Sequence, residues 1–196
     1  MREYDLIADW YANERLGDIG VPEALAMASS IAAGSRILDL GCGNGIPISR
    51  ALLERGHRVI GIDSSHEMLR RFKANFSAAG AVRGLVQDLA FVRESFDAAI
   101  SWGVLFHLRR PELVKALAAV ARILRPGAPF LFTGGDADAE PGIEGTMNGV
   151  TFRYYAGSDE SHRTLLQEHG FALLNIHTDS GDNTYYLARK STNAVC

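Results

Sequence analysis

Three glycines at alternating positions follow an apolar run that ends at Leu40: Gly41, Gly43 and Gly45. Because glycine has no Cβ, a ligand can lie directly against such a backbone. Pro47 stands where the next helix should begin, and that helix would aim its free N–H groups and positive dipole end at the loop. The pattern predicts a site for an anionic or electron-rich group.

A carboxylate follows at Asp63, at the end of the next apolar run and about twenty residues past the glycines, where it can accept hydrogen bonds from both hydroxyls of a ribose. Asp63 could instead cap the helix that starts at Ser64. Nicotinamide dinucleotide folds share both features, but their third glycine falls at the position of Ile46 here. The combination favours a nucleoside site, with an NAD-dependent oxidoreductase as the alternative.

A histidine, His107, ends the segment that leads from the fourth expected strand into this presumed site. Its ordinary pKa, near 6.5, suits proton removal at neutral pH, so it is a candidate catalytic base. The alternative is that it caps or packs at the start of the helix near Pro111. No closely spaced Cys/His set suggests a metal, and the two cysteines, Cys42 and Cys196, fit a reducing compartment.

Short apolar runs without clean alternation are typical of parallel strands covered on both faces. Four such runs alternate with helical patterns: Arg36–Leu40, Arg58–Ile62, Ala98–Ile100 and Pro129–Phe132. Ser64 and Glu67 form a potential capping box for one intervening helix. Near the C-terminus, Phe171–Thr178 and Thr184–Arg189 predict an antiparallel hairpin that turns at residues 180–183. The segment from Gly134 to Gly157 is weakly patterned, and we expect a loop over the carboxyl ends of the strands.

In order along the chain, the strings ILDLGCGNG, VIGIDSS, VQDL, FDAAISWGVLFHL and RILRPGAPFLF resemble the motifs of class I S-adenosylmethionine-dependent methyltransferases of the small-molecule type. The opening segment Tyr4–Tyr11 resembles the N-terminal helix that closes over the cofactor in that family. The resemblance implies a three-layer Rossmann-like sandwich whose mostly parallel seven-stranded sheet ends in an antiparallel C-terminal hairpin strand.

The resemblance also implies where S-adenosylmethionine binds. Around its methionine end it places Asp39, which would hold the ammonium group, together with Gly41, Cys42, Gly43, Ser101 and Trp102. Tyr11 could face the positive sulfur, where a cation–π contact contributes about 0.5–2 kcal/mol. Cys42 has no neighbour in the sequence to activate it as a nucleophile.

At the adenosine end, the resemblance gives the ribose hydroxyls to Asp63 and places Ser64 and Met68 beside the adenine. Asp88 would meet the adenine amino group, with Leu89 alongside; the alternative is that Asp88 is a turn residue.

We expect one domain over residues 1–196, with an N-terminal helical lid (1–33), a cofactor-binding core (34–133) and a substrate-side loop and terminal hairpin (134–196). It would transfer a methyl group from S-adenosylmethionine to a small molecule; a non-catalytic S-adenosylmethionine-binding module is a further alternative. Two features disfavour nucleic acid as a partner. The net charge is −3. Methyltransferases acting on base amines resemble one another in an Asn/Asp-Pro-Pro-Tyr/Phe string after the fourth strand, and this sequence has Ser101-Trp-Gly-Val104 there. No stretch could span a bilayer, so we expect a cytoplasmic protein without a membrane partner. The sequence leaves the acceptor and the oligomeric state open.

Overall fold

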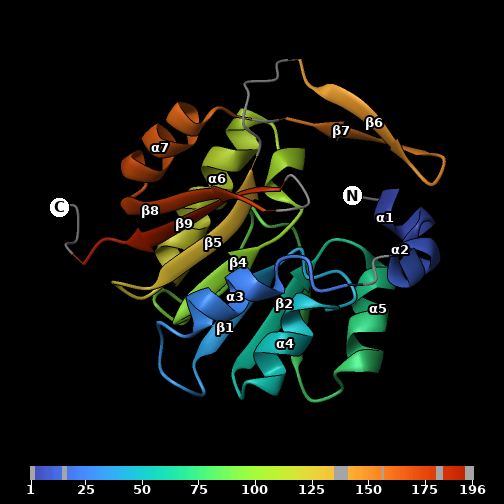
Figure 1. Ribbon diagram of the computed structural model, residues 1–196, viewed down its shortest axis with the longest axis horizontal. Helices are drawn as coiled ribbons and strands as arrows, with labels where there is room; N and C mark the ends of the chain where they lie inside the picture. The colour runs from blue at the N-terminus through green and yellow to red at the C-terminus, as the bar shows by residue number, and fades with distance from the viewer. Residues whose placement is uncertain (1–2, 15–16, 135–140, 156, 180–182, 193–196) are drawn as a thin grey trace.

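A seven-stranded sheet forms the centre of the protein (Figure 1), seen in a computed structural model that describes residues 3–14, 17–134, 141–155, 157–179 and 183–192. The strand order is β3-β2-β1-β4-β5-β9-β8. The strands are β1 (Arg36–Leu40), β2 (Arg58–Asp63), β3 (Gly80–Arg83), β4 (Ala98–Ser101), β5 (Pro129–Gly134), β8 (Phe171–Thr178) and β9 (Thr184–Lys190). The first five pair in parallel, and β9 runs antiparallel to both β5 and β8. The predicted mostly parallel sheet with a C-terminal hairpin is confirmed.

Helices cover both faces of this sheet and complete three layers (Figure 1). One face carries α3 (Val21–Ala28), α4 (Ile48–Glu54) and α5 (His66–Asn75), and the other carries α6 (Arg110–Ile123) and α7 (Asp159–Glu168). Successive strand residues alternate between the two layers: Phe130 and Phe132 pack on the α6 side, and Leu131 packs on the α3 side. Both faces of the central strands are therefore apolar, which explains their unbroken apolar runs.

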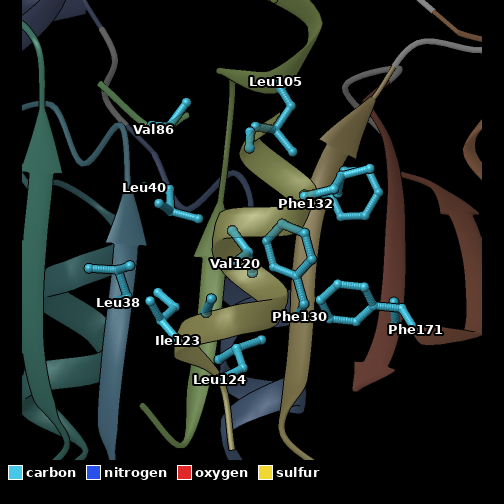
Figure 2. Packing of buried hydrophobic residues seen from close by; sticks show 14 of the residues in the cluster. Leu38, Leu40, Val86, Leu105, Val120, Ile123, Leu124, Phe130, Phe132 and Phe171 are labelled. Atoms are coloured by element: carbon cyan, nitrogen blue, oxygen red, sulfur yellow. The ribbon is translucent and has the colours of Figure 1, made fainter. Parts of the chain in front are cut away.

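The larger core lies between the sheet and α6 (Figure 2). Val120 and Ile123 at the end of α6, and Leu124 just after it, pack with Leu38 of β1 and Phe130 of β5, and all five are 1% exposed or less. Full burial of each such side chain stabilises the fold by about 1.5–3 kcal/mol. Leu40 at the carboxyl end of β1 and Leu105 after β4 belong to the same core, next to the loops from which the site is built.

Two small elements stand outside the sheet, at its carboxyl end (Figure 1). The N-terminal segment forms α1 (Glu3–Leu6) and α2 (Ala8–Glu14), so the expected helix over Tyr4–Tyr11 is present as two short helices. The prediction of a loop between Gly134 and Gly157 is wrong for the second half of that segment, where β6 (Ile143–Met147) and β7 (Val150–Tyr154) form an antiparallel hairpin. The hairpin reaches α1, which packs against β7.

Two local expectations also need correction. The cap of α5 is Ser65, whose hydroxyl accepts from the Met68 amide at 3.1 Å, whereas the capping box was expected at Ser64. The strand β3 was not expected, because its sequence Gly-Ala-Val-Arg lacks an apolar run and it lies at the exposed edge of the sheet. Residues 135–140 of the expected loop, positions 180–182 of the expected turn, and Cys196 lie outside the described residues.

Candidate active site

The glycine loop closes against the end of β2. The amides of Gly41 and Cys42 both donate to the Ile62 carbonyl, at 2.7 and 3.1 Å. The amide of Gly43 donates to Asp63 Oδ2 at 2.9 Å. Chain connections run outward in opposite directions from β1 and β4, and ligands of open α/β sheets bind in the crevice at such a switch point. The loop therefore lies where the fold itself forms a binding crevice.

Glycine is favoured at positions 41 and 43 of the loop for different structural reasons. Gly41 has φ +72°, and a Cβ there would lie 2.1 Å from Val104 Cγ2, so only glycine fits. Gly43 has φ +54°, but its Cβ would meet nothing closer than Met68 Sδ at 4.0 Å. The backbone at Gly43 is thus exposed to open space, as a cradle for a ligand requires.

Asp63 accepts hydrogen bonds from two backbone amides, one at the start of α5 and one in the glycine loop. Its Oδ1 accepts from the Ser65 amide at 2.8 Å, at the start of α5, and its Oδ2 accepts from Gly43. Burial raises the pKa of this carboxyl, and the backbone N–H groups oppose that rise. A carboxylate has about four acceptor positions, so the backbone N–H groups leave acceptor capacity for hydroxyl donors such as those of a ribose.

A cavity of about 310 Å³ opens above the loop, and we call it the inner cavity. Its volume is at the lower end of the range for small-molecule sites. Eight of the residues singled out from the sequence line it: Tyr11, Gly41, Gly43, Asp63, Ser64, Met68, Trp102 and His107. Residues from the N-terminal helices, from β1, β2 and β4 and from α5 therefore meet at one place.

A small side pocket beside the loop is lined by Asp39, Cys42 and Trp102, among others. The Ser49 hydroxyl donates to Asp39 at 2.6 Å, and burial raises the pKa of Asp39 to about 7. The indole N–H of Trp102 is buried and has no hydrogen-bond partner among the described residues. An amino acid group fits these needs, because its ammonium would stabilise the Asp39 carboxylate and its carboxylate could accept from Trp102. Burial also raises the pKa of the Cys42 thiol, which makes it a poor nucleophile.

Three of the singled-out residues lie away from both spaces. Asp88 is exposed, Leu89 is buried in the core, and the buried Ser101 hydroxyl donates to the Leu40 carbonyl at 3.2 Å. The segment just before Asp88 borders the inner cavity instead, including Leu85 and Gln87. The string VQDL indicated this segment, but Asp88 and Leu89 were chosen within it, because the preceding strand β3, which directs this segment, was not expected.

His107 lies in a short 3-10 helix, η1 (Leu105–His107), at the rim of the inner cavity. Its Nδ1 lies 2.9 Å from the Arg153 carbonyl, and its Nε2 lies 3.2 Å from the Tyr4 hydroxyl. A carbonyl can only accept, so Nδ1 carries the proton and Nε2 of the neutral ring accepts from Tyr4. Burial lowers the pKa of His107, while the Arg153 carbonyl and the charge of Glu3 partly oppose this. The ring is therefore mostly neutral at pH 7 and able to accept a proton.

A second space of about 430 Å³, which we call the outer cavity, adjoins the inner one. Four residues line both: Tyr4, Tyr11, Gly103 and His107. Gly103 is held there by a hydrogen bond from its amide to Thr133 Oγ1 at 2.7 Å. The two phenols and the imidazole therefore lie at the boundary between the two cavities.

The fold, the glycine loop and the carboxylate at the end of β2 are those expected of a class I S-adenosylmethionine-dependent methyltransferase domain. Residues 37–127 match the family model described as a methyltransferase domain. The matched region runs from β1 to the end of α6 and contains the glycine loop, Asp63 and His107.

Two proteins similar in sequence to this chain are methyltransferases by name. An uncharacterised methyltransferase of Synechocystis is 35% identical over 101 residues, which cover 52% of this chain and 47% of that protein. A tRNA (carboxymethyluridine(34)-5-O)-methyltransferase of Arabidopsis thaliana is 34% identical over 143 residues, covering 71% of this chain and 33% of that protein. The chain thus spans half or less of the length of these relatives.

Among solved structures, the fold matches the 1,6-didemethyltoxoflavin-N1-methyltransferase of Burkholderia thailandensis, solved with 1,6-didemethyltoxoflavin and S-adenosylhomocysteine. The TM-score is 0.72 at 22% identity, over 96% of this chain and 84% of that one. Within the part of the chain that the structure describes, no helix is long and apolar enough to cross a membrane. The same residues contain no group of three or more His, Cys, Asp or Glu side chains placed to hold a metal ion.

Proposed function

We propose that this protein transfers a methyl group from S-adenosylmethionine to a small-molecule acceptor. The observation that carries the proposal is the pair of adjoining cavities, which share Tyr4, Tyr11, Gly103 and His107. The inner cavity, with the glycine loop and Asp63, would hold the cofactor, and the outer one would hold the acceptor. S-adenosylmethionine supplies an activated methyl group on a positively charged sulfur.

In this proposal the cofactor is held by residues at both ends of the inner cavity. Asp63 accepts from the ribose hydroxyls, and Asp39 and Trp102 hold the amino acid group. Met68 packs beside the adenine, near Ser64, and we assign the other edge of the adenine to the segment with Leu85 and Gln87. The chain's contribution to the reaction is then alignment of the acceptor behind the methyl carbon and exclusion of water.

We further assign the acceptor's proton to His107. An acceptor N–H or O–H that faces Tyr4 gives its proton to the phenol oxygen as the Tyr4 proton passes to His107 Nε2. The acceptor atom would form its bond to the methyl carbon with its own electron pair, while the electrons of the broken sulfur–carbon bond would stay on sulfur to give S-adenosylhomocysteine. The Arg153 carbonyl, bound to Nδ1–H, then stabilises the imidazolium. General base catalysis of this kind contributes about 10²–10⁴-fold in rate.

The proposal is tested first by calorimetry with S-adenosylhomocysteine and, separately, NAD⁺. We expect S-adenosylhomocysteine to bind; binding of the dinucleotide alone would favour the oxidoreductase alternative. Transfer of labelled methyl is then measured with a metabolite extract and with tRNA. The tRNA arm is included because the Arabidopsis relative is named for that substrate. Labelling of tRNA and not of small molecules would contradict the acceptor class.

The role of His107 is tested with Tyr4→Phe and His107→Gln. Once an acceptor is known, we expect both variants to lower kcat by at least about tenfold while the affinity for S-adenosylhomocysteine is unchanged. We also expect kcat of the unaltered protein to fall as the pH is lowered below the pKa of His107, because the protonated ring cannot accept the Tyr4 proton. A pH profile that is the same in His107→Gln and in the unaltered protein would assign His107 to packing alone.

A further inference from the structure

The outer cavity has walls made mostly of aromatic rings. Trp10 comes from α2, Phe106 from η1, and Tyr154 from the end of β7, with Met147 of β6 beside them. The Phe106 and Tyr154 ring centroids lie 5.7 Å apart, and His107 lies 4.8 Å from each of those two rings. Aromatic walls favour a flat ligand with its own π system, because stacked and edge-to-face ring pairs stabilise beyond the burial of area.

These walls are held in place by contacts between distant segments. The Tyr155 amide donates to the Phe106 carbonyl, which joins the end of β7 to η1. The Tyr4 ring packs on the buried Phe152 ring of β7 at 4.9 Å, which joins α1 to the same hairpin. A cavity whose walls are joined in this way loses little conformational entropy when a ligand binds.

The polar groups of the outer cavity select on charge. The described lining residues include no Lys or Arg, whereas the Glu14 carboxylate lies on the lining from α2. The remaining polar side-chain groups are tyrosine hydroxyls, the Trp10 indole N–H, the Asn183 amide and the His107 ring, which suit neutral hydrogen-bonding ligands. A carboxylate or phosphate here would lose water without gaining a cationic partner.

We infer that the acceptor is a flat aromatic or heteroaromatic small molecule, neutral or positively charged, that binds among Trp10, Phe106 and Tyr154 with its reacting O–H or N–H toward Tyr4. The inference rests on the proposed methyl transfer and adds the class of acceptor to it. Aliphatic acids and phosphorylated substrates are disfavoured, because the described lining residues offer an anion no cationic partner.

Three probes of similar size separate the effect of aromatic rings on binding from the effect of negative charge. 2-Naphthol is flat and neutral, decahydro-2-naphthol has the same skeleton without aromatic rings, and 2-naphthoate is flat and anionic. Binding of each is measured by calorimetry and ligand-observed NMR, with the intact chain free and saturated with S-adenosylhomocysteine. We expect 2-naphthol to bind about tenfold or more tightly than either of the other two. Equal or tighter binding of 2-naphthoate or of the saturated alcohol overturns the inference.

Two adjacent tyrosines provide a matched pair of variants. Tyr154 lines the outer cavity, whereas the Tyr155 side chain packs beside Arg109 and does not line either cavity. We expect Tyr154→Ala to weaken 2-naphthol binding about tenfold and Tyr155→Ala to leave it unchanged. Trp10→Ala gives a second test of the same wall if Tyr154→Ala does not fold. Unchanged 2-naphthol binding in a folded wall variant overturns the inference.

The outcomes also separate this inference from the proposed function. Binding of S-adenosylhomocysteine without binding of 2-naphthol overturns the acceptor class and leaves methyl transfer standing. Absence of S-adenosylhomocysteine binding contradicts the proposed function, and with it the acceptor role given to the outer cavity, whatever 2-naphthol does.

Discussion

The sequence offers two carboxylates for the adenosine part of the cofactor, and the structure separates them. Asp63 lines the inner cavity, while Asp88 is exposed and lies outside it. Replacing each with asparagine keeps the shape and removes the charge. We expect Asp63→Asn to weaken S-adenosylhomocysteine binding strongly and Asp88→Asn to have no effect.

The magnitude follows from the hydrogen bonds at Asp63. Hydrogen bonds to a charged group contribute about 1.5–3 kcal/mol each, about twice the value for neutral pairs. Two ribose hydroxyls that lose a charged acceptor should cost about 2–3 kcal/mol of binding free energy, or about 30- to 150-fold in Kd. The asparagine oxygen can also satisfy only one of the two amides, Gly43 and Ser65, that Asp63 now accepts from.

The free energy of unfolding should change less than the binding free energy. An unsatisfied buried amide costs about 1–3 kcal/mol. Burial, however, raises the pKa of Asp63, so the neutral asparagine recovers part of the cost of burying its charge. We therefore expect a loss near the lower end, about 1 kcal/mol.

Calorimetric titration of both variants with S-adenosylhomocysteine, paired with urea unfolding, provides the assay. Asp88→Asn serves as the matched control and should stay within about 0.5 kcal/mol in stability. The reasoning is refuted if folded Asp63→Asn binds as tightly as the unaltered chain, or if Asp88→Asn shows the larger loss of affinity.

Three further predictions address the loop, the side pocket and the α5 cap. Because Asp39 has a pKa of about 7 in the folded protein against 3.8 ordinarily, the native state keeps a proton that the unfolded chain releases, so stability falls as pH rises from about 4 to 7. An ammonium group bound beside Asp39 lowers that pKa, so the protein should release protons when S-adenosylhomocysteine binds at pH 6.5. The release is measured by calorimetry in buffers of different ionisation enthalpy. Binding of 5′-methylthioadenosine, which has no amino acid group, should release none. Gly41→Ala should lower the free energy of unfolding by about 2 kcal/mol or more. Adding Val104→Ala should recover the part of this loss due to the 2.1 Å contact, while the cost of φ +72° remains. If the double variant recovers no stability, the clash with Val104 is not the cause. Ser65→Ala should cost about 1 kcal/mol in urea unfolding and Ser64→Ala almost nothing, and the reverse order would restore Ser64 as the cap.

Local pattern was enough for the strands and the loop that build the inner cavity. The runs around Leu38, Ile60, Ile100 and Leu131 are apolar because each strand is covered on both faces, so the pattern is a direct consequence of burial. The glycines of the loop were identifiable because their freedom to adopt positive φ is a property of the residue itself.

Other features had no local signature. The β6–β7 hairpin was expected as a loop because its strands have exposed, mixed sequences and rely on α1 and η1 for their packing. Asp88 was favoured for the adenine because it is a carboxylate near a motif, yet the unexpected edge strand β3 brings Leu85 and Gln87 to the cavity instead. The sequence shows that residue 88 is an aspartate, but it does not show that this residue is exposed and lies outside the cavity.

The sequence by itself determined the strands β1, β2, β4 and β5, the terminal hairpin, the glycine loop and the carboxylate about twenty residues beyond it, because each depends on residues close together along the chain. Only the tertiary structure decided that Tyr4 would donate to His107, 103 residues away, and that both would stand between two cavities. The physical reason is that such a boundary is made by packing the first helices and the β6–β7 hairpin over the end of the sheet, and contacts between distant segments leave no periodicity in the sequence.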